Sequence, residues 1–361
     1  MMNFFKNGLL VFCSIILTLL AAEGFLRFFP VNEGLHVQPV NEQNPIIHFK
    51  PDRSSTWSRF ADFSMVNTVH SNNYGFLNDQ EYDPNGTLPL IAVIGDSYVE
   101  AAMVPYKDTL HGRLASELKG KWRVYSFAAS GAPLSQYLAF ARFARNEFRP
   151  QKMVFVVVGN DFDESLLKYK QAGGFHYFTK DKNGDLDLQR MDYAPSALRN
   201  MVKRSVLAMY LITNTNIHAV ISNIFSPPNN RRNYVGQTSA DANDERITLS
   251  QKAVRAFLSA LPAHSGLPPQ SVLFIVDAMR PHVYTKQGSV DAKGSYFDIM
   301  RTYFMNEAAK KGYKVIDLEK TFKRDFIANG LRFEFPKDGH WNPYGHEIAF
   351  EAIRANHLPT E

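Results

Sequence analysis

Short runs of consecutive apolar residues alternate with helix-like segments from residue 88 onward in this 361-residue chain. The clearest run, 153–158, reads Met-Val-Phe-Val-Val-Val and has the length and β-branched content of a buried strand. Continuous apolar runs of this kind are typical of strands that are covered on both faces, as in parallel sheets. Further strands are predicted at 90–94, 122–127, 271–276 and 314–318.

Helical segments lie around these strands. They are predicted at 107–118, 133–146, 246–261, 296–311 and 344–355. Alternating strands and helices predict an α/β fold with a doubly wound, three-layer parallel sheet. The turns that follow the strands of such a sheet share one edge, and ligands bind at that edge.

The N-terminal segment is long and apolar enough to cross a membrane. Residues 8–22 carry no charge, and with Glu23 tolerated near one end the apolar stretch continues to residue 29. A membrane-spanning helix needs about 20 such residues. We therefore expect residues 1–29 to form a transmembrane signal anchor.

A cleaved signal peptide is the alternative for this segment. A cleavage site prefers small residues in an A-x-A pattern, which Ala22 fits and Leu20 does not. Lys6 precedes the span and Arg27 lies at its far end, so the positive-inside rule leans toward a cytoplasmic N-terminus. We thus expect a single-pass membrane protein whose main body is periplasmic or otherwise extracytoplasmic.

Two regions depart from the alternating pattern. Residues 30–87 are rich in Asn, Pro and Ser, and we expect a stalk or N-terminal extension that packs on the main domain, 88–361. Residues 165–245 form an expected insertion that covers part of the sheet edge. It contains a hairpin-like segment with a turn at Asn183-Gly184, then a helical patch near 197–217 and a polar loop near 226–245.

Composition excludes some classes of protein. The hydrophobic fraction of 45% suits a folded, enzyme-sized body, and the net charge of +5 is spread along the chain, so nucleic acid is not an expected partner. Cys13 is the only cysteine, which excludes intramolecular disulfides and cysteine-ligated metal sites. No cofactor or metal is predicted.

A serine follows the first predicted strand, in Gly95-Asp96-Ser97. A serine nucleophile needs a base, usually histidine, and a group that orients the base. Asp338 and His340 lie two residues apart on a glycine-containing loop before the last helix, where the carboxylate can fold back onto the imidazole. Both segments also suit ordinary turns, in which glycine, aspartate and serine are common.

Polar turns follow the next two strands as well. They contain Ser130-Gly131 and Gly159-Asn160-Asp161, whose backbone N–H groups and amide are potential donors to an oxyanion, although each is also typical of a plain turn.

Five polar residues have structural interpretations. Asp96 is expected to bond the backbone around its turn, and His346 to be a satisfied helix residue. Asp161, Asp163 and Glu164 are typical of the acidic first turn of a helix, rather than of a metal site.

The four polar blocks resemble those of the SGNH (GDSL-type) hydrolase superfamily over about residues 88–355. The matching blocks are Gly95-Asp96-Ser97, Ser130-Gly131, Gly159-Asn160-Asp161 and Asp338 to His340. The resemblance implies a flavodoxin-like fold with Ser97 as nucleophile, His340 as base and Asp338 as its orienting group. It also implies an oxyanion hole made of the N–H groups of Ser97 and Gly131 and the Asn160 side chain.

Two departures from the family pattern bear on function. Tyr98 replaces the usual leucine, and Lys337 stands where the family places its aspartate, three residues before the histidine. The resulting Asp-x-His-Trp block is similar to that of the alginate O-acetyltransferase branch, which adds acyl transfer to a sugar as an outcome.

The resemblance implies a membrane-anchored serine acyl-ester hydrolase or O-acyltransferase, acting on O-acylated carbohydrate or a small acyl ester. Phe175, Tyr177 and Phe178 are equally consistent with stacking on sugar faces and with a core of the insertion. The alternative class is a catalytically silent, membrane-tethered binding or assembly module in polysaccharide modification or export.

Overall fold

A five-stranded parallel sheet forms the centre of the computed structural model, which describes residues 2–182, 184–215, 217 and 234–356. Its strand order is β11-β10-β5-β3-β4, so β3, the first strand of this sheet along the chain, lies between β4 and β5, the second and the third. This is the flavodoxin-like order of a doubly wound sheet, and that prediction is confirmed. The strands are β3 (Leu90–Gly95), β4 (Arg123–Ala128), β5 (Lys152–Val157), β10 (Val272–Val276) and β11 (Lys314–Asp317).

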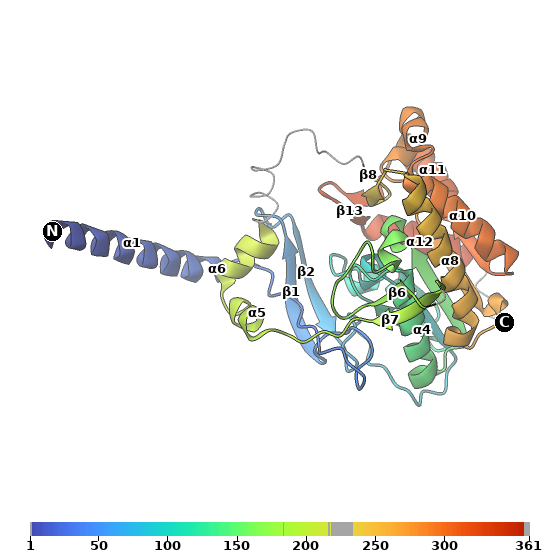
Figure 1. Ribbon diagram of the computed structural model, residues 1–361, viewed down its shortest axis with the longest axis horizontal. Helices are drawn as coiled ribbons and strands as arrows, with labels where there is room; N and C mark the ends of the chain where they lie inside the picture. The colour runs from blue at the N-terminus through green and yellow to red at the C-terminus, as the bar shows by residue number, and fades with distance from the viewer. Residues whose placement is uncertain (1, 183, 216, 218–233, 357–361) are drawn as a thin grey trace.

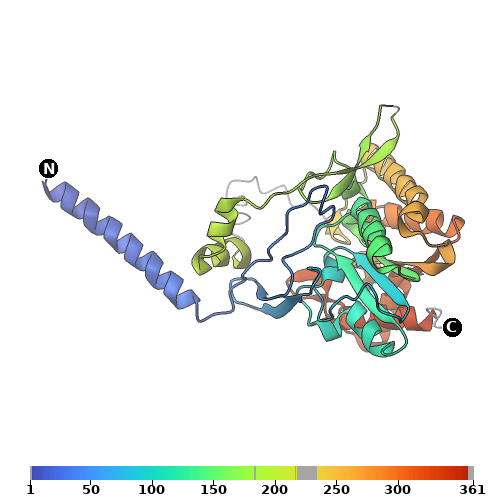
Figure 2. The same cartoon turned by 90° about the horizontal axis from the view of Figure 1, so that it is seen from below.

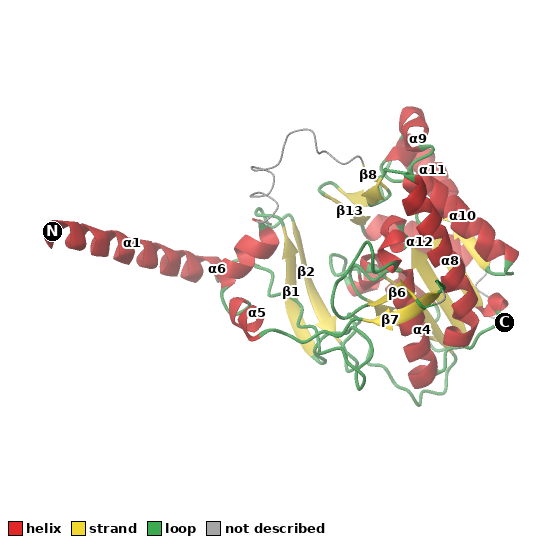
Figure 3. Cartoon of the chain, viewed as in Figure 1, coloured by secondary structure: helices red, strands yellow, loops and turns green. Residues whose placement is uncertain are grey.

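Helices cover both faces of the sheet (Figure 3). On one face Phe127, Phe155 and Phe274 pack against α4 (Leu134–Phe148), α8 (Asp244–Ser265) and α10 (Tyr296–Lys310). On the other face Val93 and Val154 pack with residues of α3 (Leu110–Glu117), α11 (Leu318–Asn329) and α12 (Pro343–Ala355). All six residues of β3 are buried, which explains why its sequence lacks polar alternation.

An apolar helix, α1 (Met2–Leu26), projects away from this body (Figure 1). Its segment Phe4–Leu26 is long and apolar enough to cross a membrane, and none of it is buried; a signal sequence passes the same test. The following region contains an antiparallel hairpin of β1 (Arg53–Arg59) and β2 (Met65–Ser71). Farther along, Phe76 and Tyr82 enter the main core.

The insertion contains the expected hairpin, made of β6 (His176–Lys180) and β7 (Leu186–Arg190). Asn183 of its turn and residues 218–233, which include part of the expected polar loop, lie outside the described residues. Phe175, Tyr177 and Phe178 are buried in the main core, so their side chains are not free to stack on a sugar. The other described elements of the insertion are α5 (Ala197–Val202), α6 (Val206–Met209), the π-helical turn η4 (Tyr210–Asn214), β8 (Tyr234–Val235) and β9 (Thr238–Ser239).

Some short elements differ from the sequence prediction. A one-turn helix, α2 (Ser97–Glu100), directly follows β3 because Asp96 caps its amino end. The expected loop around His340 is instead the strand β13 (Asp338–Trp341), paired with β12 (Glu334–Phe335). Because only two residues of each strand pair, the sequence shows too little alternation for the strand to be predicted. The others are α9 (Lys286–Ala292) and the 3₁₀ turns η1 (Tyr106–Asp108), η2 (Gly159–Asp161), η3 (Asp163–Ser165), η5 (Pro269–Ser271) and η6 (His282–Tyr284).

Candidate active site

The four blocks converge on the carboxyl edge of the sheet. Ser97 begins α2 after β3, Gly131 follows β4, and Asn160 follows β5. Since β4 and β5 lie on opposite sides of β3, this edge contains the topological switch point, where doubly wound sheets bind ligands. The strand β13 brings His340 to the same place from the far end of the chain.

Ser97, His340 and Asp338 form one hydrogen-bonded chain. The His340 Nε2 atom lies 2.8 Å from Ser97 Oγ, and His340 Nδ1 contacts Asp338 Oδ1. The same carboxylate oxygen accepts the backbone N–H of His340 at 2.9 Å, which fixes the two residues relative to each other. A neutral imidazole that donates from Nδ1 to a carboxylate leaves the Nε2 lone pair for the serine hydroxyl. The arrangement can therefore remove the hydroxyl proton as the oxygen attacks.

An arginine from the N-terminal hairpin holds the second oxygen of this carboxylate. Arg59 Nη1 contacts Asp338 Oδ2. Burial alone would raise the pKa of Asp338, but the hydrogen bonds and charge of His340, together with the charge of Arg59, lower it to about 2. Asp338 is therefore ionised at neutral pH. Sequence reasoning missed Arg59, which no motif or periodicity marks.

We expect Arg59→Gln to lower kcat for an ester substrate by about tenfold, because one of two groups that fix the Asp338 carboxylate is lost. The matched control is Arg53→Gln. Arg53 lies on the same strand, and its side chain donates to Ser55 rather than to Asp338. Steady-state kinetics of the two variants measure the difference. Equal rates for both would contradict a positioning role for Arg59.

Asp96 stabilises the turn that presents Ser97. Its Oδ1 atom accepts the backbone N–H of Tyr98 at 2.9 Å, while Ser97 Oγ lies 3.3 Å from Oδ2, longer than its contact with His340. Burial raises the pKa of Asp96 to about 6. The structural interpretation of Asp96 therefore agrees with its contacts.

The turn after β4 is held from two sides. Gly131 has a φ of +78°, which favours glycine, and its carbonyl accepts a hydrogen bond from Lys170 Nζ at 2.7 Å. The neighbouring Ser130 N–H donates to the buried carboxylate of Glu100, on α2. Within the described residues, the Gly131 N–H has no hydrogen-bond partner, so it remains available to a ligand.

Asn160 lies on the same sheet edge, but its amide is already engaged. Its Nδ2 atom donates to Glu164 Oε2 at 3.2 Å, and Glu164 pairs with Lys170. Lys170 and Glu164 thus connect Asn160 with Gly131. The structure brings Ser97 together with its expected base and orienting group, whereas Gly131 and Asn160 stand beside them without lining the cleft described next.

A cleft of about 600 Å³ opens beside Ser97 and His340. Its other walls come from the N-terminal extension and the insertion, which sequence reasoning did not assign to the site. The lining residues outside the catalytic candidates are Asn32, Trp57, Ser58, Arg59, Phe60, Ala61, Ala102, Met103, Ser130, Ile212, Thr213, Asn214 and Thr215. Aromatic and amide side chains thus surround a space whose volume is in the range of small-molecule sites.

Glu100 gives the site a pH-dependent stability. Burial raises its pKa from 4.5 to about 7, so the folded chain keeps a proton that the unfolded chain releases between these values. The free energy of unfolding is therefore expected to fall as pH rises through this window, by roughly 3 kcal/mol. The raised pKa of Asp96 contributes in the same direction, so it also lowers the free energy of unfolding as pH rises.

Glu100→Gln is expected to flatten this slope, because the amide oxygen still accepts the Ser130 N–H but has no proton to lose. Urea unfolding at several pH values measures the slope. Glu117→Gln, at an exposed position on α3, is the control and is expected to leave it unchanged. An equal slope in both variants would contradict the assignment.

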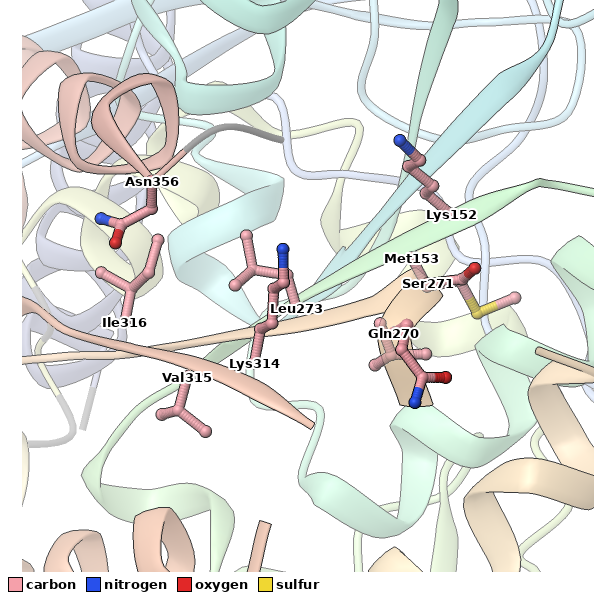
Figure 4. Close-up of a pocket in the computed structure, with 10 residues that line it drawn as sticks. Lys152, Met153, Gln270, Ser271, Leu273, Lys314, Val315, Ile316 and Asn356 are labelled. Carbon is pink, nitrogen blue, oxygen red and sulfur yellow. The ribbon is translucent and has the colours of Figure 1, made fainter. Parts of the chain in front are cut away.

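A second cavity, of about 240 Å³, lies at the opposite edge of the sheet (Figure 4). It is lined at the amino ends of β5, β10 and β11, with Lys152 and Lys314 among its residues. Its lining contains Ser271 but no histidine, whereas the cleft at the carboxyl edge contains Ser97 and His340 in hydrogen-bond contact.

Two expectations about polar residues can be compared with the described part of the chain. His346 is buried on α12 and accepts the backbone N–H of Leu110 at 3.1 Å, as a satisfied helix residue does. Asp163 forms a buried ion pair with Arg246 at 2.9 Å, and Asp161 accepts from Tyr137 and the backbone of Val158. Among the described residues, no group of three or more His, Cys, Asp or Glu side chains is placed to hold a metal ion.

The sequence matches no family model and no curated protein. Solved structures similar to the chain include a protein named TesA, with 13% identity and a TM-score of 0.41, covering 75% of this chain and 99% of that one. A member of the lipolytic G-D-S-L family from Veillonella parvula DSM 2008 has 10% identity and a TM-score of 0.40, covering 74% and 96%. An acetyl xylan esterase, AlAXEase, has 13% identity and a TM-score of 0.37, covering 74% and 100%. At these identities each likeness concerns the fold alone.

Proposed function

We propose that this chain is a membrane-anchored serine acyl-ester hydrolase of the SGNH type. The observation that carries the proposal is the 2.8 Å separation of His340 Nε2 and Ser97 Oγ, with Asp338 on the other imidazole nitrogen. A serine hydroxyl has little nucleophilicity unless a base takes its proton, and here that base is in hydrogen-bond contact. The apolar helix α1 supports the anchor.

The proposed reaction has two halves. In the first, Ser97 Oγ forms a bond to the ester carbonyl carbon while His340 Nε2 takes its proton; the carbon–oxygen bond to the alcohol then breaks, and that proton passes to the leaving oxygen. In the second, His340 takes a proton from water as the water oxygen bonds to the carbonyl carbon; the bond from that carbon to Ser97 Oγ then breaks, the proton passes to Ser97 Oγ, and the carboxylic acid leaves. The N–H groups of Ser97 and Gly131 and the Asn160 amide are the proposed donors to the oxyanion.

The proposed substrate is an O-acylated, in particular acetylated, carbohydrate or another small acyl ester. Trp57 and Phe60 in the cleft walls support this choice, because flat aromatic surfaces beside hydrogen-bonding groups suit a sugar ring or its acyl group. Transfer of the acyl group to a carbohydrate hydroxyl, rather than to water, is the second outcome of the same acyl-enzyme.

Mass spectrometry of the purified chain after incubation with p-nitrophenyl acetate tests the proposal. We expect an added acetyl group on Ser97 that disappears with time. When an oligosaccharide is present, acetylated oligosaccharide is expected only if the enzyme transfers the acetyl group to it. Free acetate without acetylated oligosaccharide would identify a hydrolase. Absence of any acyl adduct and of p-nitrophenol release would contradict the enzyme and favour the silent binding module.

A further inference from the structure

Exposed apolar side chains gather where α1 meets the body. At the end of α1, Phe28 is 88% exposed. On α5 of the insertion, Leu198 is 65% and Met201 63% exposed. Both views place α5 and α6 beside the body end of α1 (Figures 1 and 2). Large apolar side chains that stand in water next to an apolar helix indicate a surface that is covered in the native setting.

Hydrogen bonds fasten α1 to the insertion. The Glu23 carboxylate on α1 accepts the N–H groups of Val206 and Leu207, at 3.1 and 2.8 Å, and the hydroxyl of Ser205 at 2.9 Å. A side chain of α1 therefore caps the amino end of α6, which lies four residues after α5. The orientation of α5 is thus coupled to that of α1.

Aromatic rings join the same junction to the cleft. Phe29, after α1, stacks on Phe63 of the β1–β2 turn with ring centroids 5.7 Å apart, and Phe63 contacts Tyr210 of η4 at 5.6 Å. The residues beside these rings in sequence, Phe60 to Ala61 and Ile212 to Thr213, line the cleft next to Ser97. The cleft is therefore held close to the end of α1.

Basic side chains on α5 and directly after it favour an acidic partner. Arg199 lies on α5, and Lys203 and Arg204 follow its last residue. Arg199 and Arg204 are exposed and Lys203 is half-buried, while acidic residues are absent from the seven residues Leu198 to Arg204. A short helix with apolar and basic side chains next to a membrane span suits the interface of a bilayer that contains anionic lipids.

We propose that α5, together with the exposed residues at the end of α1, lies on the surface of an anionic lipid bilayer. This inference rests on the proposed function in one respect, because it takes α1 to be a membrane anchor. It adds a second membrane contact that fixes how the body stands on its anchor. The cleft beside Ser97 then opens at the level of the lipid headgroups, so the ester substrates enter it from the membrane surface.

Fluorescence quenching of the full chain in vesicles tests this inference. The sole cysteine, Cys13, is labelled with an environment-sensitive dye to report on α1. In a Cys13→Ser background, Met201→Cys reports on α5, and Ile327→Cys, 77% exposed on α11 at the other end of the molecule in Figure 1, is the matched control. The vesicles contain equal amounts of phosphatidylcholine and phosphatidylglycerol, with nitroxide-labelled headgroups for quenching at the surface and acyl-chain nitroxides for α1.

We expect headgroup nitroxides to quench the dye at position 201 several-fold more than the dye at position 327. Replacing Arg199 and Arg204 by glutamate is expected to reduce the quenching at 201, and so is phosphatidylcholine alone. Equal quenching at 201 and 327, with Cys13 still quenched by acyl-chain nitroxides, would overturn the inference and leave the anchor intact. An unquenched Cys13 would overturn both the anchor and the inference. Fluorophosphonate labelling of Ser97 in the same samples reports separately on the enzyme.

Discussion

Ser97→Ala is expected to abolish labelling by a fluorophosphonate and to reduce the hydrolysis of p-nitrophenyl acetate by about 10⁴-fold or more. The substitution removes only the hydroxyl group, whose oxygen lies 2.8 Å from His340 Nε2. His340→Ala is expected to cause a similar loss, because the serine is then left without a proton acceptor. Asp338→Asn is expected to cause a smaller loss, since the base remains.

The rate of the double variant Ser97→Ala/His340→Ala shows whether the two residues act as a unit or contribute independently to catalysis. Residues that act as a unit are not additive, so the double variant is expected to be about as slow as either single one. Ser116→Ala, at an exposed position on α3, is the control and is expected to leave the rate unchanged. Undiminished labelling of Ser97→Ala would contradict the proposed nucleophile.

The sheet was predictable because its strands are buried on both faces. Burial of all six residues of β3 requires an apolar run without polar alternation, and such a run followed by Gly95-Asp96-Ser97 is visible in the sequence alone. The approach of His340 to Ser97 was likewise expected, although 243 residues separate them in the chain. The family resemblance supplied this pairing, because the topology of the sheet gathers the turns that follow its strands and does not by itself place the segment before the last helix.

The supporting contacts were not predictable in the same way. Arg59 lies on a half-buried strand of the N-terminal extension, and nothing near it in sequence relates it to Asp338, 279 residues away. Glu100 and Lys170 act on Ser130 and Gly131 through backbone groups, which any residue type supplies. Such contacts depend on how loops pack in three dimensions, so local pattern and composition do not reveal them.

The oxyanion donors fall between these two cases. The family resemblance implies Asn160, and the turn after β5 does bring it to the correct edge, but its amide Nδ2 bonds to Glu164. Gly131 combines a left-handed backbone with an N–H that is free within the described residues. The Gly131 N–H is thus unoccupied, whereas Asn160 would have to use its second amide N–H, and the oxyanion role of both residues stays a proposal.

Arg280→Met is expected to lower the free energy of unfolding by about 3–5 kcal/mol, because it leaves a buried carboxylate without its cation. The guanidinium is buried and bonds Asp277 at 2.7 Å, the hydroxyl of Tyr98 at 2.9 Å and the carbonyl of Gly339 at 2.9 Å. Tyr98 follows Ser97 and Gly339 precedes His340, so Arg280 joins the two halves of the candidate site. The same substitution is therefore expected to reduce kcat by about 100-fold through misplacement of His340.

Urea unfolding of the detergent-solubilised chain measures the loss of stability. It is followed by tryptophan fluorescence, to which the buried Trp341 contributes. Arg332→Met is the control: this side chain is 64% exposed and 3.7 Å from Glu334, so we expect a change within about 0.5 kcal/mol. Tyr98→Phe removes only the hydroxyl group, and we expect it to lower the free energy of unfolding by about 1 kcal/mol. This variant still tests the contacts of Arg280 if Arg280→Met does not fold. Equal stability of the Arg280 and Arg332 variants would mean that Asp277 does not need its buried cation. Normal kcat in a folded Arg280→Met would mean that the nucleophile and the base are positioned independently of it.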